Sequence, residues 1–433
     1  MGARSRDGRR RILIRLLVIA VIAFAGRAAY VLLETQHHEL PLGLVGGNEA
    51  ARAWDEEYYE KGAHRLADGR GFRFVYLGLP GDERAEHPPL ASVALAPAAL
   101  VSDSTVPMRL TVAFTGAVVV FLIGLCGLAV GGPTVATVAA VLAAIYPNLW
   151  MNDGLIMAET FAALGVAGTV LAAYRLLQRP GVGRAAVLGA ACAVAMLSRS
   201  ELALLVAFVA LPTAWLAEAT MRRRARLAGV VAVAALVPVA PWVLYNLGRF
   251  EEPVLLSNAD GDVLLGANCD ATYSGPLLGS HAGLCDGERP FPPEASELSA
   301  KQRDQAFEYV SDHLDRLPVV VAARIGRMWN VYEPFDDIRR SASEGRPRWA
   351  AFAGLFVYWA LLPLAVLGTI TLLRRQIPVV PLLGAVVLVT LHAALFFGWV
   401  RHRVGAEVPL VVLAAVGLVA LTGGIRRVTP DAA

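Results

Sequence analysis

Charged residues are scarce in this sequence. Asp, Glu, Lys and Arg together make up 17% of the 433 residues, whereas 56% are hydrophobic. About a quarter of the residues of a soluble domain are charged, so this chain has too little polar surface to cover a water-facing body of its size. The mean hydropathy of +0.54 agrees with this. The composition excludes an ordinary soluble domain and indicates an integral membrane protein.

A strong excess of one charge sign is also missing. The formal net charge is only +3, whereas nucleic-acid-binding domains carry a pronounced basic face. The small positive excess comes from short arginine clusters of the kind that flank membrane spans on their cytoplasmic side. We therefore expect a lipid-embedded protein with no nucleic-acid partner.

Long apolar runs occupy most of the chain instead. The first, residues 12–33, follows three arginines; it exceeds a typical signal-peptide core, and Arg27 interrupts any cleavage site, so we expect an uncleaved span. A helix needs about 20 apolar residues to cross a bilayer. The sequence thus predicts an all-α polytopic membrane protein with about ten spans. The other nine runs are 109–130, 134–150, 157–177, 185–198, 202–218, 227–245, 350–373, 377–397 and 408–424.

Basic clusters on alternate loops predict the orientation. Because such clusters remain in the cytoplasm, both termini are expected there. The clusters lie at 4–11, 178–184, 221–226, 372–376 and 425–427. The predicted divisions are a cytoplasmic tail with the first span (1–33), a first extracytoplasmic loop (34–108), spans two to seven (109–245), a second extracytoplasmic segment (246–349), and the last three spans with a cytoplasmic tail (350–433).

The sequence has only four cysteines. Cys126 and Cys192 fall within predicted spans, where thiols act as small packing residues. Cys269 and Cys285 fall in the second outer segment, where an oxidising compartment permits a disulfide. Such a bond would close a loop of about 15 residues and stabilise the segment by roughly 3 kcal/mol. Two free thiols are the alternative.

Two helices are expected in the later half of this outer segment. The sequence Ser299-Ala-Lys-Gln resembles a capping box and predicts a helix that ends near residue 317. Pro318 suits the start of a second helix, which carries Arg324 and Arg327 one turn apart. We expect this second helix to lie at the level of the lipid headgroups.

Acidic and aromatic residues open the first outer loop. Asp55 and Glu56 follow a tryptophan, and Tyr58 and Tyr59 come directly after the acidic run. The loop ends with Glu86-His87-Pro-Pro, just before the chain returns to the membrane. Taken alone, the acidic run also fits a solvated turn, and the histidine also fits a structural residue at the interface.

Together with motifs further along, this loop resembles that of the GT-C membrane glycosyltransferases. The nearest branch contains protein O-mannosyltransferases, aminoarabinose transferases and lipopolysaccharide-core sugar transferases, and is similar to glycosyltransferase family 39. The sequence departs from this pattern at Tyr245, where many relatives carry Arg. The shared motifs are the acidic residue before paired tyrosines, a Gly-Phe turn, His-Pro-Pro-Leu, Arg109-Leu, Met157-Ala-Glu159, Ser198-Arg199-Ser-Glu201, Pro241-Trp242 with Asn246, and Arg401-His-Arg403.

The resemblance implies transfer of a sugar from a polyprenyl-phosphate donor to a hydroxyl of a glycan, lipid or protein. The reaction would take place on the extracytoplasmic side of the cell membrane. A hydroxyl is a poor nucleophile and needs a base, for which Asp55 is the candidate. A single displacement with one base predicts inversion at the anomeric carbon. The other expected catalytic residues are Glu56, Glu86 and His87.

Cations are needed where the leaving phosphate develops charge. Arg401, Arg403 and Arg199 are the candidates, although the first two also fit interfacial anchors, and Arg199 also fits a structural pair with Glu201. Glu86 and His87 are possible ligands of a divalent metal ion. The expected substrate-binding residues are Tyr58, Tyr59, Glu159 and Asn246.

A transporter or flippase of lipid-linked saccharides is the main alternative, and a non-catalytic scaffold is a third. Transporters commonly show internal repeats and broken helices that meet at the midplane. No repeat is evident in this sequence, and its polar residues gather at the predicted outer ends of the spans. The pattern therefore favours a transferase.

Overall fold

The fold is all-helical, as predicted. The computed structural model describes residues 2–33, 49–72, 84–283, 285 and 294–423, and no strand occurs among them. The bundle consists of α1 (Gly2–Leu33), α4 (Val106–Ile145), α5 (Pro147–Trp150), α6 (Glu159–Gln178), α7 (Val182–Ser198), η2 (Ser200–Ala203), η3 (Val206–Ala210), α8 (Leu211–Leu216), α9 (Met221–Leu236), α10 (Ala240–Leu247), α16 (Arg348–Arg374), α17 (Val380–Leu395), η5 (Val400–Arg403) and α18 (Val404–Leu421). Outside it lie α2 (Glu49–Ala67), α3 (Leu90–Ala99), α11 (Asp260–Ala267), α12 (Asp270–Tyr273), η4 (Gly275–Leu277), α13 (Ala295–Asp312), α14 (Leu317–Met328) and α15 (Pro334–Ser343).

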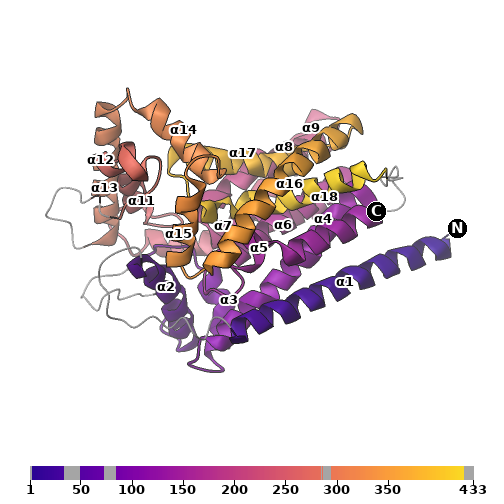
Figure 1. Cartoon of the computed structure of the whole chain (residues 1–433), viewed down its shortest axis with the longest axis horizontal. Helices are drawn as coiled ribbons and strands as arrows, with labels where there is room; N and C mark the ends of the chain where they lie inside the picture. The colour runs from indigo at the N-terminus through magenta and orange to yellow at the C-terminus, as the bar shows by residue number, and fades with distance from the viewer. Residues whose placement is uncertain (1, 34–48, 73–83, 284, 286–293, 424–433) are drawn as a thin grey trace.

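Helix α18 lies at the centre of the bundle. It packs against α4, α6, α16 and α17, and most of its side chains are buried. Helix α1 lies along the edge against α4 (Figure 1). The start of α1 and the end of α18 lie at one end of the bundle, and α2 with α11–α13 lie at the other (Figure 1). This arrangement is the one expected for two termini on the same side of a membrane.

The predicted number of spans is not confirmed. Among the described residues, and with α4 counted as one helix, five helices are long and apolar enough to cross a membrane, or six if α9 and α10, which meet at 53°, form one bent span. Three further predicted spans fall on shorter apolar helices, at Val182–Ser198, Ser200–Leu216 and Val380–Leu395. The chain is therefore a multi-pass membrane protein, but length and composition do not establish ten crossings.

Helix α4 consists of two antiparallel arms. Its turn is at Gly132, where φ is +78° and ψ is −168°, a conformation that is essentially restricted to glycine. In a straight helix the 16 residues from Gly124 to Ala140 would span about 24 Å. A β-carbon placed on Gly124 would instead lie 3.1 Å from Cβ of Ala140. The predicted spans 109–130 and 134–150 thus correspond to separate arms of this hairpin.

Helices α16 and α18 approach each other unusually closely. A β-carbon on Gly368 would lie 1.9 Å from the carbonyl oxygen of Leu413, and one on Gly417 would lie 2.0 Å from that of Leu364. Small residues commonly allow such contact between membrane helices, where packing rather than the hydrophobic effect drives association. This contact holds the later part of α16 against the later part of α18.

A disulfide joins Cys269 and Cys285 in the second outer segment, with a Cα–Cα distance of 6.0 Å. The predicted capping box at Ser299 is wrong. Helix α13 begins earlier, because the carboxylate of Glu294 accepts the free N–H groups of its first turn at 2.9 Å. Ser299 lies inside the helix, where its hydroxyl donates to Asp260.

The expectation for Arg324 and Arg327 in α14 is also wrong. Both side chains are buried rather than directed to lipid headgroups. Arg324 donates to the carbonyl of Ala267 at 2.6 Å, and Arg327 donates to that of Leu278 at 2.7 Å. An amphipathic pattern with two arginines cannot by itself distinguish a polar face on lipid from one on a loop-rich subdomain.

Candidate active site

Seven charged side chains gather at the end of the bundle that carries α2. They come from α2, the start of α6, η2, the residues before α16, and η5, which are far apart in sequence. We call this group the arginine–carboxylate cluster. Its members are Asp55, Glu159, Glu201, Glu344, Arg199, Arg346 and Arg401.

Asp55 lies on α2 between a guanidinium and an imidazole. Its Oδ2 accepts a close contact from Nη2 of Arg401, and its Oδ1 lies 3.2 Å from Nε2 of His87. Its side chain retains 21% exposure. Three predicted site residues, two from the first outer loop and one from η5, are therefore brought together.

The surroundings of Asp55 determine its charge. Burial alone would raise the pKa of this carboxyl, but the charges of Arg401 and His87 and their hydrogen bonds outweigh burial and hold the pKa well below its usual value. Asp55 is therefore ionised at neutral pH, as a proton acceptor must be.

Glu159 is the centre of the cluster. It occupies the first turn of α6, where the helix dipole favours a negative charge, and it is almost completely buried. Its Oε1 lies 3.1 Å from Nη1 of Arg199, 3.4 Å from Nε of Arg401 and 3.9 Å from Nη2 of Arg346. One carboxylate thus holds three guanidinium groups around a single point.

Glu344 and Arg346 were not predicted from the sequence. Glu344 accepts from Nη1 of Arg401 at 2.8 Å and also contacts Arg346. Arg346 donates from Nε to Oδ1 of Asn152 at 2.8 Å. Its Nη2, like Nε of Arg401, is buried without a hydrogen-bond partner among the described residues. The only hint in the sequence was the position of both residues just before an apolar run.

The charges of the cluster almost balance, with four carboxylates against three guanidinium groups. A buried charge is costly unless it is paired, and even paired charges gain little over apolar packing. So dense a group at the ends of membrane helices therefore indicates a functional site rather than a stabilising device.

Tyr58 and Tyr59 pack against His87. Both rings are 3% exposed. The hydroxyl of Tyr58 donates to the carbonyl of His87 at 3.3 Å, and the ring of Tyr59 stacks on the imidazole with 5.1 Å between centroids. The two tyrosines fix the position of the ring that contacts Asp55.

Two predicted catalytic residues lie outside the cluster. Glu56 accepts from Arg109 at 2.6 Å and from the backbone N–H of Ile156 at 3.3 Å, so it ties α2 to α4 and to the loop before α6. Glu86 pairs with Arg84 at 3.0 Å. Within the described part of the chain, Glu86 and His87, the possible metal ligands, do not belong to a group of three ligand atoms that all lie within 4.8 Å of one another.

Arg403 and Asn246 also lie apart from the cluster. Arg403 is fully buried, donates to Glu407 at 2.8 Å and lies over the ring of Tyr358 at 3.7 Å. Asn246 is fully buried and accepts a hydrogen bond from Arg249 at 3.1 Å. The structure gives both residues partners within the protein core.

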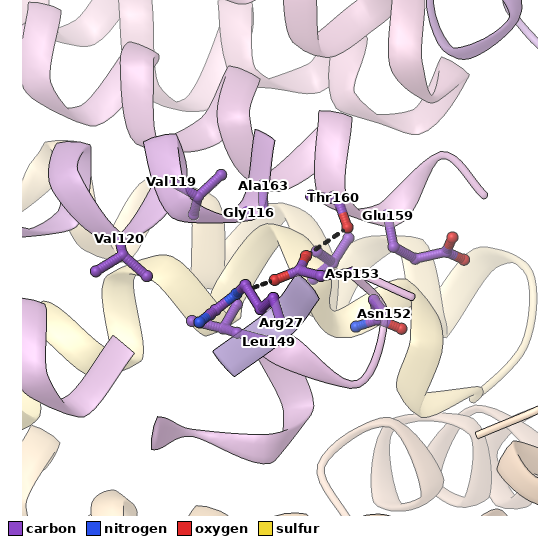
Figure 2. A pocket seen from close by; sticks show the side chains of 11 residues that line it. Arg27, Gly116, Val119, Val120, Leu149, Asn152, Asp153, Glu159, Thr160 and Ala163 are labelled. Carbon is purple, nitrogen blue, oxygen red and sulfur yellow. Dashed lines mark hydrogen bonds and ion pairs between the residues drawn. The ribbon is translucent and has the colours of Figure 1, made fainter. Parts of the chain in front are cut away.

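A buried ion pair supports the cluster from the side of α1. Nε of Arg27 lies 2.5 Å from Oδ2 of Asp153, whose Oδ1 accepts from the hydroxyl of Thr160 at 2.8 Å. Figure 2 shows these side chains lining a small cavity together with Asn152 and Glu159. This ion pair therefore holds the first span against the loop that positions Glu159.

Comparison with known proteins shows the fold. Residues 86–245 match the family described as "Dolichyl-phosphate-mannose-protein mannosyltransferase". No curated protein matches the sequence. The structure is similar to the apo crystal structure of the oligosaccharyltransferase of Archaeoglobus fulgidus, with a TM-score of 0.54 and 14% identity over 94% of this chain and 50% of that chain.

Two complexes with lipid phosphates are also similar. Archaeoglobus fulgidus AglB with an inhibitory peptide and a dolichol-phosphate has a TM-score of 0.50 at 13% identity, over 94% of this chain and 50% of that one. ArnT from Cupriavidus metallidurans bound to undecaprenyl phosphate has a TM-score of 0.43 at 17% identity, over 94% and 78%. The chain spans about half the length of the archaeal enzymes. The predicted resemblance to GT-C proteins is confirmed at the level of the fold.

Proposed function

We propose that this chain, which has the fold of the GT-C glycosyltransferases, transfers a sugar from a polyprenyl-phosphate-linked donor to an acceptor hydroxyl. The observation that carries this proposal is the position of Asp55 between His87 and Arg401 in a cluster at the ends of membrane helices. The similar archaeal structure in complex with a dolichol-phosphate and the family match over residues 86–245 support a donor of this kind. The reaction takes place on the extracytoplasmic face of the cell membrane.

In this proposal Asp55 is the general base. It accepts the proton of the acceptor hydroxyl as the oxygen attacks the anomeric carbon, and the bond from that carbon to the phosphate oxygen breaks in the same displacement. One displacement inverts the configuration at that carbon. His87, held by Tyr58 and Tyr59, keeps the Asp55 carboxylate oriented.

Arginines of the cluster stabilise the leaving phosphate. Arg401, Arg199 and Arg346 are the proposed contacts, with Arg346 in place of Arg403, which is buried against Glu407. Guanidinium groups suit this role because their planar donors match phosphate oxygens. Buried N–H groups of Arg346 and Arg401 that lack hydrogen-bond partners among the described residues are available for it.

Donor binding also prepares the base. Without a phosphate, Arg401 is shared by Asp55, Glu159 and Glu344. A carboxylate in contact with a guanidinium is a weak base. When the donor phosphate draws Arg401 toward itself, the pKa of Asp55 rises and the carboxylate becomes a better proton acceptor. The donor therefore has to bind before the acceptor reacts.

The test compares Asp55→Asn with Glu57→Gln in the purified full chain, using a panel of polyprenyl-phosphate monosaccharides and scoring release of polyprenyl phosphate. Glu57 is a matched control, because it is an acidic residue two positions after Asp55 on α2 and pairs with Lys61 at the surface. Loss of a general base lowers turnover by about 10²–10⁴-fold. We expect this loss for Asp55→Asn and near-normal turnover for Glu57→Gln.

Turnover like wild type by a folded Asp55→Asn protein would remove Asp55 as the base. Proteoliposomes that translocate a labelled lipid-linked sugar without ever transferring it would instead support the transporter hypothesis.

A further inference from the structure

A second group of ligating side chains lies beside Arg199 and shares Glu201 with the arginine–carboxylate cluster. Glu201 lies on η2, His392 near the end of α17, and His402 on η5. One ligand atom from each lies within 4.8 Å of the other two. The fold thus brings two histidines of one region together with a glutamate about 190 positions earlier in the chain, and all three residue types bind metal ions.

His392 is unsatisfied in this position. Its side chain is 6% exposed, and neither ring nitrogen has a hydrogen-bond partner among the described residues. A buried imidazole needs one partner for its N–H group and another for its lone pair. Leaving both ring nitrogens without a partner costs free energy in a membrane helix. A ligand from outside the chain is therefore expected beside this ring.

The spacing of the three side chains is close to that of a metal site. The His392 and His402 rings have centroids 5.1 Å apart and planes inclined by 15°. Three atoms 4.8 Å apart lie at most about 2.8 Å from their common centre. Zinc binds histidine and carboxylate ligands at about 2.0–2.2 Å, so each ligand atom needs to move by about 0.7 Å, which ordinary side-chain adjustment supplies.

We propose that Glu201, His392 and His402 bind a zinc ion. Two imidazoles and one carboxylate are a donor set that tetrahedral zinc accepts, with the fourth position left for water. The ion would join η2, α17 and η5, three segments that converge at the arginine–carboxylate cluster. The proposal does not depend on the identity of the sugar or of the acceptor.

Arg199 competes with the ion. Its Nε lies 2.5 Å from Oε1 of Glu201, and its Nη2 lies 2.7 Å from Nδ1 of His402. When zinc takes these ligands, Arg199 retains its contact with Glu159. Because a guanidinium repels a divalent cation at this range, removing Arg199 should strengthen zinc binding rather than weaken it. A site in which Arg199 were a supporting residue would show the opposite.

The test measures metal content and stability of the full chain in detergent. The protein is stripped with chelator and dialysed against zinc chloride, and bound metal is counted by mass spectrometry. We expect about one zinc per chain and a higher midpoint of thermal unfolding with zinc. Affinity should fall at least ~10-fold in His392→Gln and in His402→Gln. It should rise in Arg199→Gln and stay unchanged in His87→Gln.

The variant His87→Gln separates this site from any metal bound near Asp55. Loss of zinc from His87→Gln with retention in His392→Gln would overturn the proposal, as would wild-type protein that binds no zinc. If His392→Gln does not fold, His402→Gln and Arg199→Gln decide the matter, because their predicted effects on affinity have opposite signs. Binding that none of the four variants changes would show an adventitious ion only.

Discussion

At the scale of single residues, Arg401 couples the parts of the candidate site. It contacts Asp55, Glu159 and Glu344, which belong to three separate segments of the chain. Its positive charge lowers the pKa of Asp55, whereas burial raises that pKa. A change at Arg401 should therefore alter how the reaction depends on pH and not only its rate.

We predict that Arg401→Gln adds an acidic limb to the pH profile of kcat/KM. In the wild type Asp55 is ionised at every pH above the ordinary carboxyl pKa of about 3.9, so it contributes no such limb near neutrality. Without Arg401, the largest of the causes that oppose burial is lost, and the pKa of Asp55 rises. The rate measured at about pH 5 should then fall relative to that at about pH 8. Arg339→Gln, at the exposed surface, is the control.

The same shift has a consequence for stability. Because the folded-state pKa of Asp55 is depressed, its contribution is present above the unfolded-state pKa and is lost as pH falls through the folded-state value. In the Arg401→Gln protein the folded-state pKa of Asp55 is higher, so this contribution to stability at neutral pH should be smaller than in wild type. Identical activity profiles for the two proteins would contradict the assigned contact.

The sequence predicted part of the cluster for identifiable reasons. Asp55, Glu159, Arg199 and Arg401 were found because they lie in motifs with a family resemblance. Arg403 was misassigned to the same site. Both arginines lie on η5, and in a 3₁₀-helix of three residues per turn, side chains two positions apart point in very different directions. Only the structure shows which of the two faces Asp55.

At the scale of elements, the contact between α1 and the loop before α6 depends on the pair Arg27–Asp153. Both side chains are almost fully buried. The pair is the buried polar link between the first span and the segment that carries Glu159 (Figure 2). A buried pair adds little net stability, but breaking it leaves one unpaired charge in an apolar setting.

We predict that Arg27→Met lowers the free energy of unfolding by about 3–5 kcal/mol. The double variant Arg27→Met, Asp153→Asn should recover most of this loss, because the remaining amide is neutral and still has Thr160 as a partner. The measurement is the free energy of unfolding in detergent of the wild type, the two single variants and the double variant, which together form a double-mutant cycle. Simple addition of the single effects would show that the two residues do not interact.

The elements were predicted more reliably than their ends. Apolar runs located the membrane helices because a helix that crosses a bilayer needs a long stretch of apolar residues. The reversal at Gly132 was read as a gap between two runs, which the glycine conformation explains. The start of α13 was misplaced, because Glu294 caps it with a carboxylate that does not belong to the usual Ser, Thr, Asp or Asn set.

At the scale of the whole molecule, the cluster lies at the end of the bundle opposite the start of α1 (Figure 1). Basic loops predict that the start of α1 is cytoplasmic. The cluster would then face outward, where a donor that diffuses in the lipid can reach it from the side. The number of crossings remains the weaker part of the prediction, because several apolar helices are short.

We predict that two variants, each with one added cysteine, react with a membrane-impermeant maleimide from opposite sides of the membrane. Asp103→Cys lies in an exposed turn of the first outer segment and should react in intact cells. Arg223→Cys lies on an exposed part of α9 and should react only after lysis. The native thiols do not interfere, since Cys126 and Cys192 are buried. The reverse pattern of labelling would invert the proposed topology.

The pair Arg27–Asp153 also determines a sequence of events in time. The two residues are 126 positions apart. At 5–20 residues per second, the ribosome therefore completes Asp153 about 6 to 25 seconds after Arg27. An unpaired arginine inside the bilayer costs roughly 2.5–3.5 kcal/mol throughout this interval. The first span can therefore form its ion pair with the loop before α6 only after the α4 hairpin and α5 have been made, so the order of synthesis limits the order of assembly.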